Sequence, residues 1–366
     1  MIKLFEPYID QDGIDAVTEV LKSGWIGTGP VVAQLEKEFA EFVGAKYAVA
    51  VNSATSALHL AVKVVGVEDW DEVITTPTTF ISTNHALLYE GAIPVFCDVE
   101  DATCNLDLDK AEEEVTNRTK AIMVVHYAGN PLNMDKLYAF AARHEIAVIE
   151  DAAHAMGAKY RGKRIGSFGL TCFSFQAVKN LPAGDGGMVT TNSKEQYDKL
   201  MQLRWMGIDK STFDRTSSTE YAWEYEVEEI GYKYAMNDIN AALVLSGLKH
   251  LDNDNIDRRD IAARYRSGLR DDIKTLAYTP RGESSNHIFT IRVPNRDELY
   301  EKLAAAGINA GVHYKPNHLY PVYEEFRFPL PVAEQIYKET LSLPMHLKLT
   351  LNDIAYICEK VNEYAD

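Results

Sequence analysis

The sequence predicts an α/β fold with a large, mostly parallel sheet covered by helices, followed by a smaller α+β domain. Short apolar runs, such as residues 47–51 and 121–125, alternate with helical patterns from residue 10 to residue 149. Strands that are apolar along their whole length are typical of parallel sheets buried on both faces. The length of 366 residues also exceeds that of most single domains, which predicts about two domains.

Apolar periodicity predicts the elements of the first domain. Ile14, Val17 and Leu21 share one face of a helix at 10–22, and Gly24 follows its end. Further helices are expected at residues 32–44, 56–65, 81–90, 107–115 and 133–144, and strands at 47–51, 73–75, 93–96, 121–125 and 146–149. Sheets built from such alternating units bind ligands at the carboxyl ends of their strands.

The character of the chain changes near residue 250. Residues 252–270 predict a highly charged helix with few apolar anchors, which suits a connector. Beyond it, strands are expected at 287–293 and 308–313, and helices at 296–306 and 351–363. We therefore predict a large domain over residues 1–250 and a small α+β domain, with the connecting helix, over residues 251–366.

Composition and charge exclude several classes of protein. Hydrophobic residues make up 46% and charged residues 25%, the balance of an ordinary globular protein. The formal charge of −17 argues against nucleic acid as a partner, because phosphate binding needs clustered lysine and arginine. No apolar run is long enough for a membrane helix, and the first residues lack the apolar core of a signal peptide. We expect a cytoplasmic protein with no membrane partner and no metal site, whose four scattered cysteines are free thiols.

Small residues follow the strand at 47–51 and indicate a phosphate-binding cup. Residues 52–56 would let the backbone approach an anion, and the helix that begins there offers free N–H groups. Ala54 and Thr55 lie at this point, and Thr55 or Ser56 can add a hydroxyl. The alternative is a plain N-cap without a ligand.

Two later loops offer an aromatic ring and a carboxylate. Phe80 follows the strand at 73–75, where a flat ligand could stack on its ring, unless the ring belongs to the core. Asp151 ends a buried strand, a position that is costly for an acidic residue without a partner. A cationic ring nitrogen is one such partner, and capping of the next helix is the alternative. His154, three residues on, could point the same way.

Lys179 lies between an aromatic strand and a glycine-rich turn. Most lysines are solvated, but this one is flanked by Val178 and Leu181. Desolvation lowers the pKa of a lysine and makes its amine a nucleophile. The glycines at 184, 186 and 187 leave space for a ligand against the backbone.

These four features together describe a site for pyridoxal 5′-phosphate. The cup suits its phosphate, the aromatic ring its pyridine ring, the carboxylate its ring nitrogen and the lysine its aldehyde. Each feature is weak when it is taken alone. Their order along the chain makes the combination specific.

Seven stretches of the chain resemble the sugar aminotransferases of the DegT/DnrJ/EryC1/StrS family. They are residues 23–30, 52–58, 77–80, 150–155, 174–187, 231–238 and 311–314. The resemblance covers essentially the whole chain, and the stretch that contains Lys179 is the most specific. It implies pyridoxal phosphate as cofactor and the fold type I architecture, like that of aspartate aminotransferase.

The resemblance implies a role for each matching residue. Lys179 matches the lysine that binds the cofactor covalently and later shuttles the proton, and Asp151 matches the partner of the pyridine nitrogen. His154 falls near the O3′ hydroxyl of the cofactor, and Phe80 matches the residue that stacks on its ring. The remaining matches are the phosphate contacts Ala54, Thr55 and Ser174, and the sugar-nucleotide contacts Trp25, His313 and Tyr314.

One stretch departs from the family. Many members have Asn and Arg in a Gly-Tyr-Asn-Tyr-Arg stretch, where this chain has Lys233 and Ala235. In the family that Asn reaches the phosphate of a neighbouring subunit, so the resemblance implies a homodimer. Lys233 either makes this contact as a cation or is a surface lysine.

The family implies transfer of an amino group from an amino acid, usually glutamate, to a keto group of a nucleotide-linked deoxyhexose. The spacing from Lys179 to Gly187 resembles members that act at the sugar C4 rather than C3. Lys179 argues against the family's dehydratases, which have histidine at this position. Three alternatives stay open. They are an aminotransferase that acts on 3-keto sugars, another fold type I enzyme such as an aldolase or lyase, and a non-catalytic protein that keeps the fold.

Overall fold

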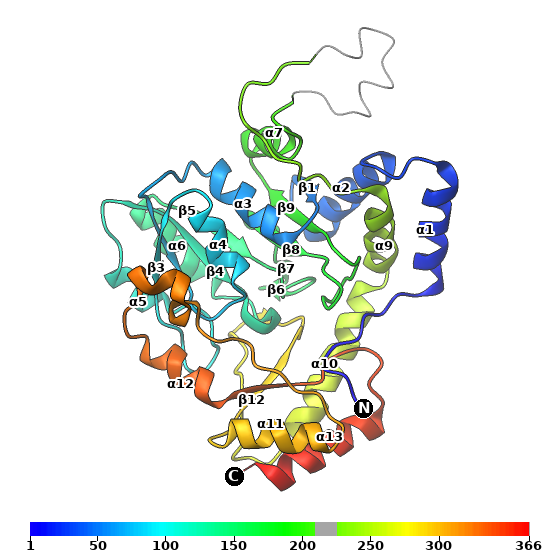
Figure 1. Cartoon of the computed structure of the whole chain (residues 1–366), viewed down its shortest axis with the longest axis vertical. Helices are drawn as coiled ribbons and strands as arrows, with labels where there is room; N and C mark the ends of the chain where they lie inside the picture. The colour runs from blue at the N-terminus through cyan, green and yellow to red at the C-terminus, as the bar shows by residue number, and fades with distance from the viewer. Residues whose placement is uncertain (209–224, 366) are drawn as a thin grey trace.

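The computed structural model describes residues 1–208 and 225–365, and its centre is a seven-stranded sheet (Figure 1). Its strands are β1 (Tyr47–Val51), β2 (Glu72–Thr75), β3 (Ile93–Phe96), β4 (Thr119–Val125), β5 (Ala147–Asp151), β8 (Leu170–Ser174) and β9 (Gly187–Thr191). They lie in the order β1-β9-β8-β5-β4-β2-β3. β9 is antiparallel to both of its neighbours and the other pairs are parallel, which confirms the predicted mostly parallel sheet.

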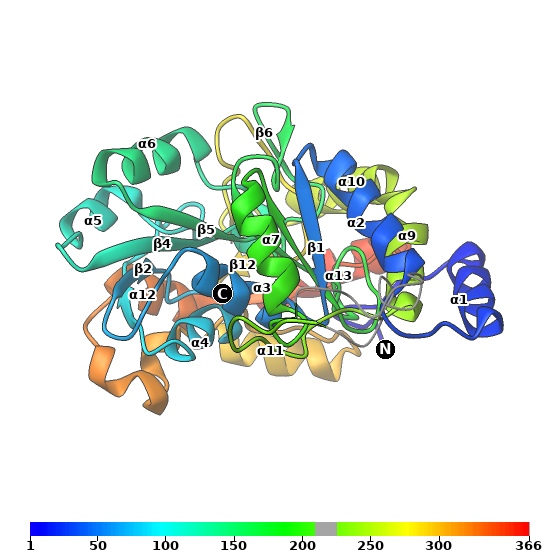
Figure 2. The same ribbon diagram turned by 90° about the horizontal axis from the view of Figure 1, so that it is seen from above.

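Helices cover both faces of this sheet. They are α1 (Gln11–Ser23), α2 (Pro30–Val43), α3 (Ala54–Val64), α4 (Ser82–Leu88), α5 (Leu108–Glu113), α6 (Met134–His144), α7 (Lys194–Leu203) and α9 (Asp238–Leu248), with the 3-10 turn η1 (Tyr127–Gly129). Along β1, Ala48 and Ala50 join the core under α2, α5, α6 and α9, whereas Val49 and Val51 join the core under α3, α4 and α7. Seen from above, α5 and α6 lie on one side of the strands and α3 and α4 on the other (Figure 2).

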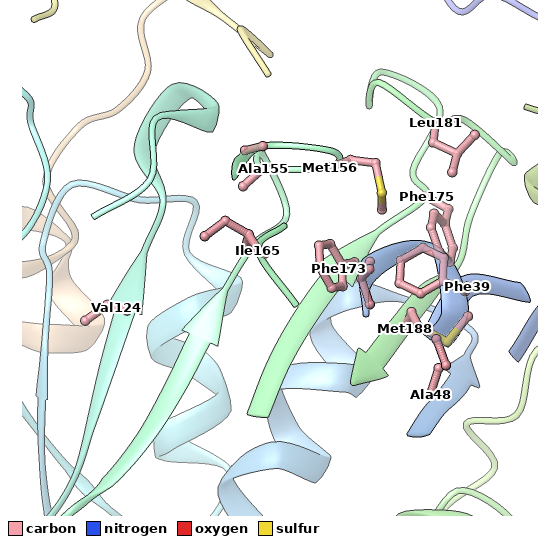
Figure 3. Close-up of a cluster of buried hydrophobic side chains, with 14 of the residues drawn as sticks. Phe39, Ala48, Val124, Ala155, Met156, Ile165, Phe173, Phe175, Leu181 and Met188 are labelled. Carbon is pink, nitrogen blue, oxygen red and sulfur yellow. The ribbon is translucent and has the colours of Figure 1, made fainter. Parts of the chain in front are cut away.

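Aromatic rings close the first of these cores next to the segment that holds Lys179. Phe39 of α2 meets Phe173 and Phe175 edge to face, with ring centroids 5.3 and 5.8 Å apart (Figure 3). All three rings are fully buried. The strand before Lys179 is therefore anchored in the core, so the lysine starts from a rigid support.

The C-terminal part begins with α10 and contains two small sheets, β10-β12-β13 and β11-β6-β7. Its elements are α10 (Leu251–Gly268), β10 (Lys274–Thr275), β11 (Gly282–Glu283), β12 (Phe289–Arg292), α11 (Arg296–Ala305), η2 (Asn317–Leu319), η3 (Pro321–Phe326), α12 (Pro331–Glu339), β13 (Thr340–Leu343) and α13 (Leu351–Tyr364). β6 (Lys159–Tyr160) and β7 (Lys163–Arg164) come from the first part of the chain. The N-terminal residues also pack here, since Ile2 bridges Ile308 (Figure 1).

The predicted elements agree with the structure, with one exception. A strand expected at 308–313 is wrong, because this segment forms only single bridges with two different partners. Ile308 pairs with Ile2, and Gly311 pairs with Ser342. Since the segment changes partner within three residues, no continuous ladder forms. The division of the chain at residue 250 stays a prediction.

Two further properties concern the described residues as a whole. None of their helices is long and apolar enough to cross a bilayer. All four cysteines are buried and unpaired, as the sequence predicts.

Candidate active site

The sheet register brings the predicted loops to one edge. Gly187 at the start of β9 lies opposite both Val51 at the end of β1 and Ser174 at the end of β8. On the other side of β8, Asp151 at the end of β5 lies opposite Cys172. The loops that follow β1, β5 and β8 therefore meet above these three strand ends, where α/β sheets bind their ligands.

The start of α3 forms the first wall of the site. Ser53 caps the helix by accepting a hydrogen bond from the Ser56 amide at 3.1 Å, so the helix begins at Ala54, two residues earlier than the sequence predicts. The amides of Ala54 and Thr55 lie in its first turn, where no preceding helical carbonyl is available to them. The Thr55 hydroxyl donates to Ser82 at 2.9 Å. These amides, with the positive end of the helix dipole, suit a phosphate group.

Gly187 permits a close approach of two backbone segments beside this helix start. A Cβ atom at position 187 would lie 2.5 Å from the Ser53 carbonyl oxygen and 2.8 Å from the Ala54 amide nitrogen. A larger residue would therefore displace the cup or the strand. Ser174, buried and in register with Gly187, completes this side of the cup.

Asp151 is a buried carboxylate at the end of β5. One of its oxygens accepts from the Thr83 hydroxyl at 2.7 Å, and the other from the Ala153 amide at 3.0 Å. Burial raises the pKa of Asp151, although these hydrogen bonds act in the opposite direction. An ionised carboxylate in this position is stabilised by a cationic partner, which a protonated ring nitrogen supplies.

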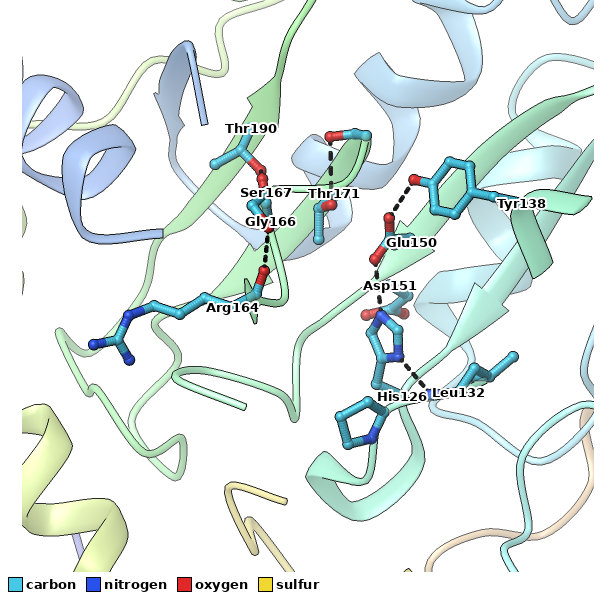
Figure 4. A network of polar contacts seen from close by, with 12 residues as sticks. His126, Leu132, Tyr138, Glu150, Asp151, Arg164, Gly166, Ser167, Thr171 and Thr190 are labelled. Carbon is cyan, nitrogen blue, oxygen red and sulfur yellow. Dashed lines mark hydrogen bonds and ion pairs between the residues drawn. The ribbon is translucent and has the colours of Figure 1, made fainter. Parts of the chain in front are cut away.

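A second buried carboxylate supports β5 from its other face (Figure 4). Glu150 accepts hydrogen bonds from Tyr138 at 2.7 Å and from His126 at 3.0 Å. The other nitrogen of His126 accepts from the Leu132 amide at 3.2 Å, which places the single proton of this ring on the side of Glu150. Glu150 is thus satisfied within the fold, which leaves Asp151 as the carboxylate available to a ligand.

Lys179 is half-buried in the loop between β8 and β9. Burial lowers the pKa of Lys179 to about 8, while the charge of Asp151 acts in the opposite direction. Its amine nitrogen lies 3.4 Å from Nε2 of His287. At a pKa of about 8, roughly a tenth of this amine is unprotonated at pH 7 and about half at pH 8, far more than for an ordinary lysine. This unprotonated fraction is the nucleophile.

His154 lies beside this amine with one nitrogen unused. Its Nε2 contacts the Tyr314 hydroxyl at 3.0 Å, and its ring centroid lies 4.5 Å from that of His287. Nδ1 of His154 is buried and has no hydrogen-bond partner among the described residues. Burial lowers the pKa of His154 well below its ordinary value, and the positive charge of Lys179 acts in the same direction. The neutral ring therefore has one nitrogen open to a ligand.

The C-terminal part supplies the opposite wall through His313 and Tyr314. Nδ1 of His313 contacts the Ser342 hydroxyl at 2.8 Å, and burial lowers the pKa of His313 to about 4. Burial raises the pKa of Tyr314, so its hydroxyl keeps its proton. The ring of Tyr314 lies nearly parallel to that of His154, with centroids 5.9 Å apart.

Phe80 stands at the mouth of the site and is 58% exposed, so it does not belong to the core. Its ring centroid lies 6.3 Å from that of Tyr314. Asn317 holds its loop by donating to the carbonyl oxygen of Thr79 at 2.7 Å. An exposed, well-supported ring is suited to stacking on a flat ligand.

Trp25 and Lys233 belong to a second group of residues. The Lys233 ammonium lies 3.1 Å from the ring centroid of Trp205, and the Lys233 carbonyl oxygen accepts from Asn52 at 3.2 Å. Trp25 donates to the Thr28 carbonyl oxygen and lines a cavity of about 820 Å³ between α2, α7 and β1, which Trp205 also lines. The structure thus groups Asp151, His154, Lys179, His313, Tyr314 and Phe80 around one site, with Ala54, Thr55 and Ser174 in the adjoining cup.

Sequence reasoning missed three residues of the site, namely Thr83, His287 and Asn317. Each contacts a site residue that is distant in the sequence, so no local sequence pattern predicts its place in the site. The one available signal was the polar segment 284–287 directly before an apolar strand.

The residues present fit pyridoxal phosphate. The cup at α3 suits a phosphate, Asp151 suits a cationic ring nitrogen, and the open Nδ1 of His154 suits a ring hydroxyl. The Lys179 amine, with its pKa lowered to about 8, suits an aldehyde.

The model of the DegT/DnrJ/EryC1/StrS aminotransferase family matches residues 7–362. The chain belongs to this family. The spore coat polysaccharide biosynthesis protein SpsC of Bacillus subtilis is 42% identical, over 98% of this chain and 95% of SpsC. The family acts on sugars with pyridoxal phosphate, so this chain is a pyridoxal phosphate-dependent sugar aminotransferase of fold type I.

Two solved structures show the same fold along their whole length. Spr1654 of Streptococcus pneumoniae, assigned as a sugar aminotransferase and solved in its PMP form, has a TM-score of 0.94 at 32% identity, covering 100% of this chain and 99% of its own. PseC of Helicobacter pylori, an aminotransferase involved in the biosynthesis of pseudoaminic acid, has a TM-score of 0.92 at 33% identity, with the same coverage of both chains.

Proposed function

We propose that this aminotransferase moves the amino group of glutamate to the C4 keto group of a nucleotide-linked deoxyhexose. The observation that supports the site is the Lys179 amine, whose pKa is lowered to about 8, beside the buried carboxylate Asp151. The C4 position is proposed because the spacing from Lys179 to Gly187 resembles that of family members that act on 4-keto sugars. The relative SpsC is named for polysaccharide biosynthesis, which suits an amino sugar as the product.

The residues of the chain divide the work of this reaction. Pyridoxal phosphate, when bound, supplies a carbonyl carbon that accepts the amino group and a ring that withdraws electrons. Ala54, Thr55 and Ser174 hold its phosphate, and Phe80 packs against its ring. Asp151 keeps the ring nitrogen protonated, and His154 orients the ring hydroxyl. Lys179 binds the cofactor and moves protons between the reacting atoms.

The sugar nucleotide is proposed to bind between His313, Tyr314 and Phe80. His313 stays uncharged at neutral pH because burial lowers its pKa to about 4, so it serves as a neutral hydrogen-bond partner. Tyr314 keeps its hydroxyl proton and covers His154, which limits the access of water to Lys179. Trp25, which the resemblance also implies as a sugar-nucleotide contact, lines the separate cavity between α2, α7 and β1 and is given no role in this site.

We further propose that the enzyme is a homodimer in which Lys233 reaches the phosphate bound by a neighbouring subunit. Lys233 is exposed, and exposed apolar side chains lie a few residues before it in the part of the chain that the structure describes. Ile230 is 86% exposed and Val227 is 54% exposed. Apolar residues at this level of exposure are typical of interfaces between subunits.

The test is an amino-transfer assay with glutamate and a panel of 4-keto and 3-keto sugar nucleotides, read by mass spectrometry. The expected product is a 4-amino sugar nucleotide, with its position assigned by NMR. A 3-amino product would overturn the position, and turnover of amino acids alone would favour an aldolase or lyase. Lys163→Ala, which changes an exposed lysine in β7, serves as the control for Lys179→Ala.

A further inference from the structure

His287 lies next to the reactive Lys179, and no role in the site has yet been assigned to it. It comes from the segment before β12, where its backbone amide donates to the Ala128 carbonyl oxygen at 3.0 Å. Its side chain is buried, and its Nε2 lies 3.4 Å from the Lys179 amine nitrogen. Since both groups can carry protons, the location of the proton on His287 decides what this contact does.

Asn180 determines that location, because its own orientation is fixed. Its Nδ2 lies 2.9 Å from the Ser285 carbonyl oxygen, which can only accept a hydrogen bond. Nδ2 also donates to Oδ1 of Asn255 at 3.1 Å, and Asn255 in turn donates to the Met156 carbonyl oxygen at 2.9 Å. Both contacts require the Asn180 nitrogen on this side and its oxygen on the other.

The Asn180 oxygen faces Nδ1 of His287 at 3.1 Å. An amide oxygen only accepts, so Nδ1 must carry a proton. Burial lowers the pKa of His287 well below its ordinary value, and the charge of Lys179 acts in the same direction. The ring therefore holds one proton only, and its Nε2 presents a lone pair to Lys179.

The ring of His287 is also held in place. It stacks on Phe5 with an interplanar angle of 8° and a centroid distance of 5.5 Å. His154 packs against it at 4.5 Å. A ring fixed by these contacts cannot turn its protonated edge towards the lysine without losing the bond to Asn180.

We propose that His287 is a positioning residue for Lys179, with Nε2 accepting a hydrogen bond from the lysine amine in the tautomer that Asn180 sets. The inference rests on the proposed role of Lys179. The acceptor holds the amine beside the ring hydroxyl site at His154 and stabilises its ammonium form. Without this acceptor, the half-buried ammonium of Lys179 would have one donor fewer satisfied and would lose its proton more easily.

The tautomer is tested by NMR on the full-length protein with ¹⁵N-labelled histidine. The His287 signals are assigned by their loss in His287→Gln. The expected pattern is a pyrrole-type Nδ1 and a pyridine-type Nε2 that stay unchanged from pH 6 to pH 9. A proton on Nε2, or a cationic ring in this range, overturns the proposal. The tautomer is read from the wild-type protein, and the loss of the same signals in His287→Phe gives the assignment if His287→Gln fails to fold.

The effect on the lysine is tested without cofactor. The pH dependence of Lys179 acetylation, followed by peptide mass spectrometry, gives its pKa in the wild type and in variants. His287→Phe keeps a ring against Phe5 but removes the acceptor, and is expected to lower the pKa of Lys179 by roughly one unit, a tenfold change in the ratio of amine to ammonium. His287→Gln places an amide oxygen near the position of Nε2 and is expected to recover most of this shift.

The control is His346→Gln, which changes a buried histidine that donates to the Lys3 carbonyl oxygen. It is expected to leave the pKa of Lys179 unchanged. Equal shifts in His287→Phe and His287→Gln, or no shift in either, overturn the proposal. Neither readout needs a sugar or turnover, so failure to transfer an amino group to any keto sugar would count against the proposed function alone.

Discussion

Asp151 and Lys179 are the two residues on which the chemistry depends most, and both follow from the sequence. A carboxylate that ends a buried strand and a lysine in an apolar stretch are unusual on energetic grounds. His287 could not be predicted in the same way, because its contact with Lys179 joins residues 108 positions apart. A histidine before a strand has many ordinary explanations until the fold places it.

Asp151→Asn should lower the rate of amino transfer by at least about a hundredfold, since an amide cannot stabilise a protonated ring nitrogen. The rate of amino transfer is measured by steady-state kinetics, first at a saturating concentration of pyridoxal phosphate and then at ten times that concentration. Asp297→Asn, which changes a carboxylate whose side chain is 90% exposed, is the control. Full recovery of the rate by excess cofactor would show that Asp151 contributes only to the affinity for pyridoxal phosphate and not to the reaction itself.

Lys179→Met should raise the free energy of unfolding of the cofactor-free protein at pH 7, because a partly buried ammonium costs free energy that methionine does not. The folded protein releases this proton near pH 8 and the unfolded chain near pH 10.5. The wild type binds fewer protons than its unfolded chain between these values, so its stability rises with pH in this window. The advantage of the variant should therefore be largest below pH 8 and shrink towards pH 10.5.

Denaturant titrations at pH 7 and pH 10 measure this difference. An advantage of the same size at both pH values would mean that the ammonium of Lys179 is not destabilised in the folded protein.

At the level of elements, the sequence predicts the strands of the large sheet better than the ends of its helices. Buried strands are marked by continuous apolar runs, such as the one that forms β1. Apolar periodicity predicts the start of α3 two residues late, because the serine cap, Ser53, has no apolar signature. The segment 308–313 has the composition of a strand, but it divides its pairing between Ile2 and Ser342, which are distant in the sequence.

Gly187→Ala tests the cup formed by β9 and the start of α3. The added Cβ would lie 2.5 Å from the Ser53 carbonyl oxygen, and overpacking of this kind typically costs about 1–3 kcal/mol. We expect the Kd for pyridoxal phosphate to rise at least about fivefold. Fluorescence titration of the apoenzyme measures it.

Gly27→Ala is the matched control, since no heavy atom lies within 4 Å of the Cβ it would add. If wild type and Gly187→Ala bind pyridoxal phosphate with equal affinity, the phosphate does not bind in the cup beside Gly187.

At the level of the whole molecule, the order of motifs along the chain predicts the fold type, and the C-terminal part completes the site. His287 reaches Lys179 and Tyr314 reaches His154 from beyond residue 250, and His313 packs edge to face against Tyr314. Such contacts between distant parts of the chain depend on how the two parts pack, which local patterns do not encode.

The proposed homodimer predicts that Lys233→Ala weakens the retention of pyridoxal phosphate, because a cation near the phosphate of the neighbouring subunit is lost. Light scattering gives the mass in solution, and dialysis followed by absorbance gives the retained cofactor. Lys163→Ala is the control for a change of charge at the surface. A fully active monomer would reject the shared site. A dimer in which Lys233→Ala holds the cofactor normally would show that Lys233 only packs on Trp205.

The most direct test of the central claim is borohydride reduction of the protein loaded with pyridoxal phosphate, followed by peptide mass mapping. Reduction fixes the cofactor on the lysine that holds it. We expect the label on Lys179, and we expect Lys179→Ala to lose both the label and amino transfer while keeping the wild-type fold by circular dichroism. A label on another lysine, or amino transfer at the wild-type rate by Lys179→Ala, would contradict the account.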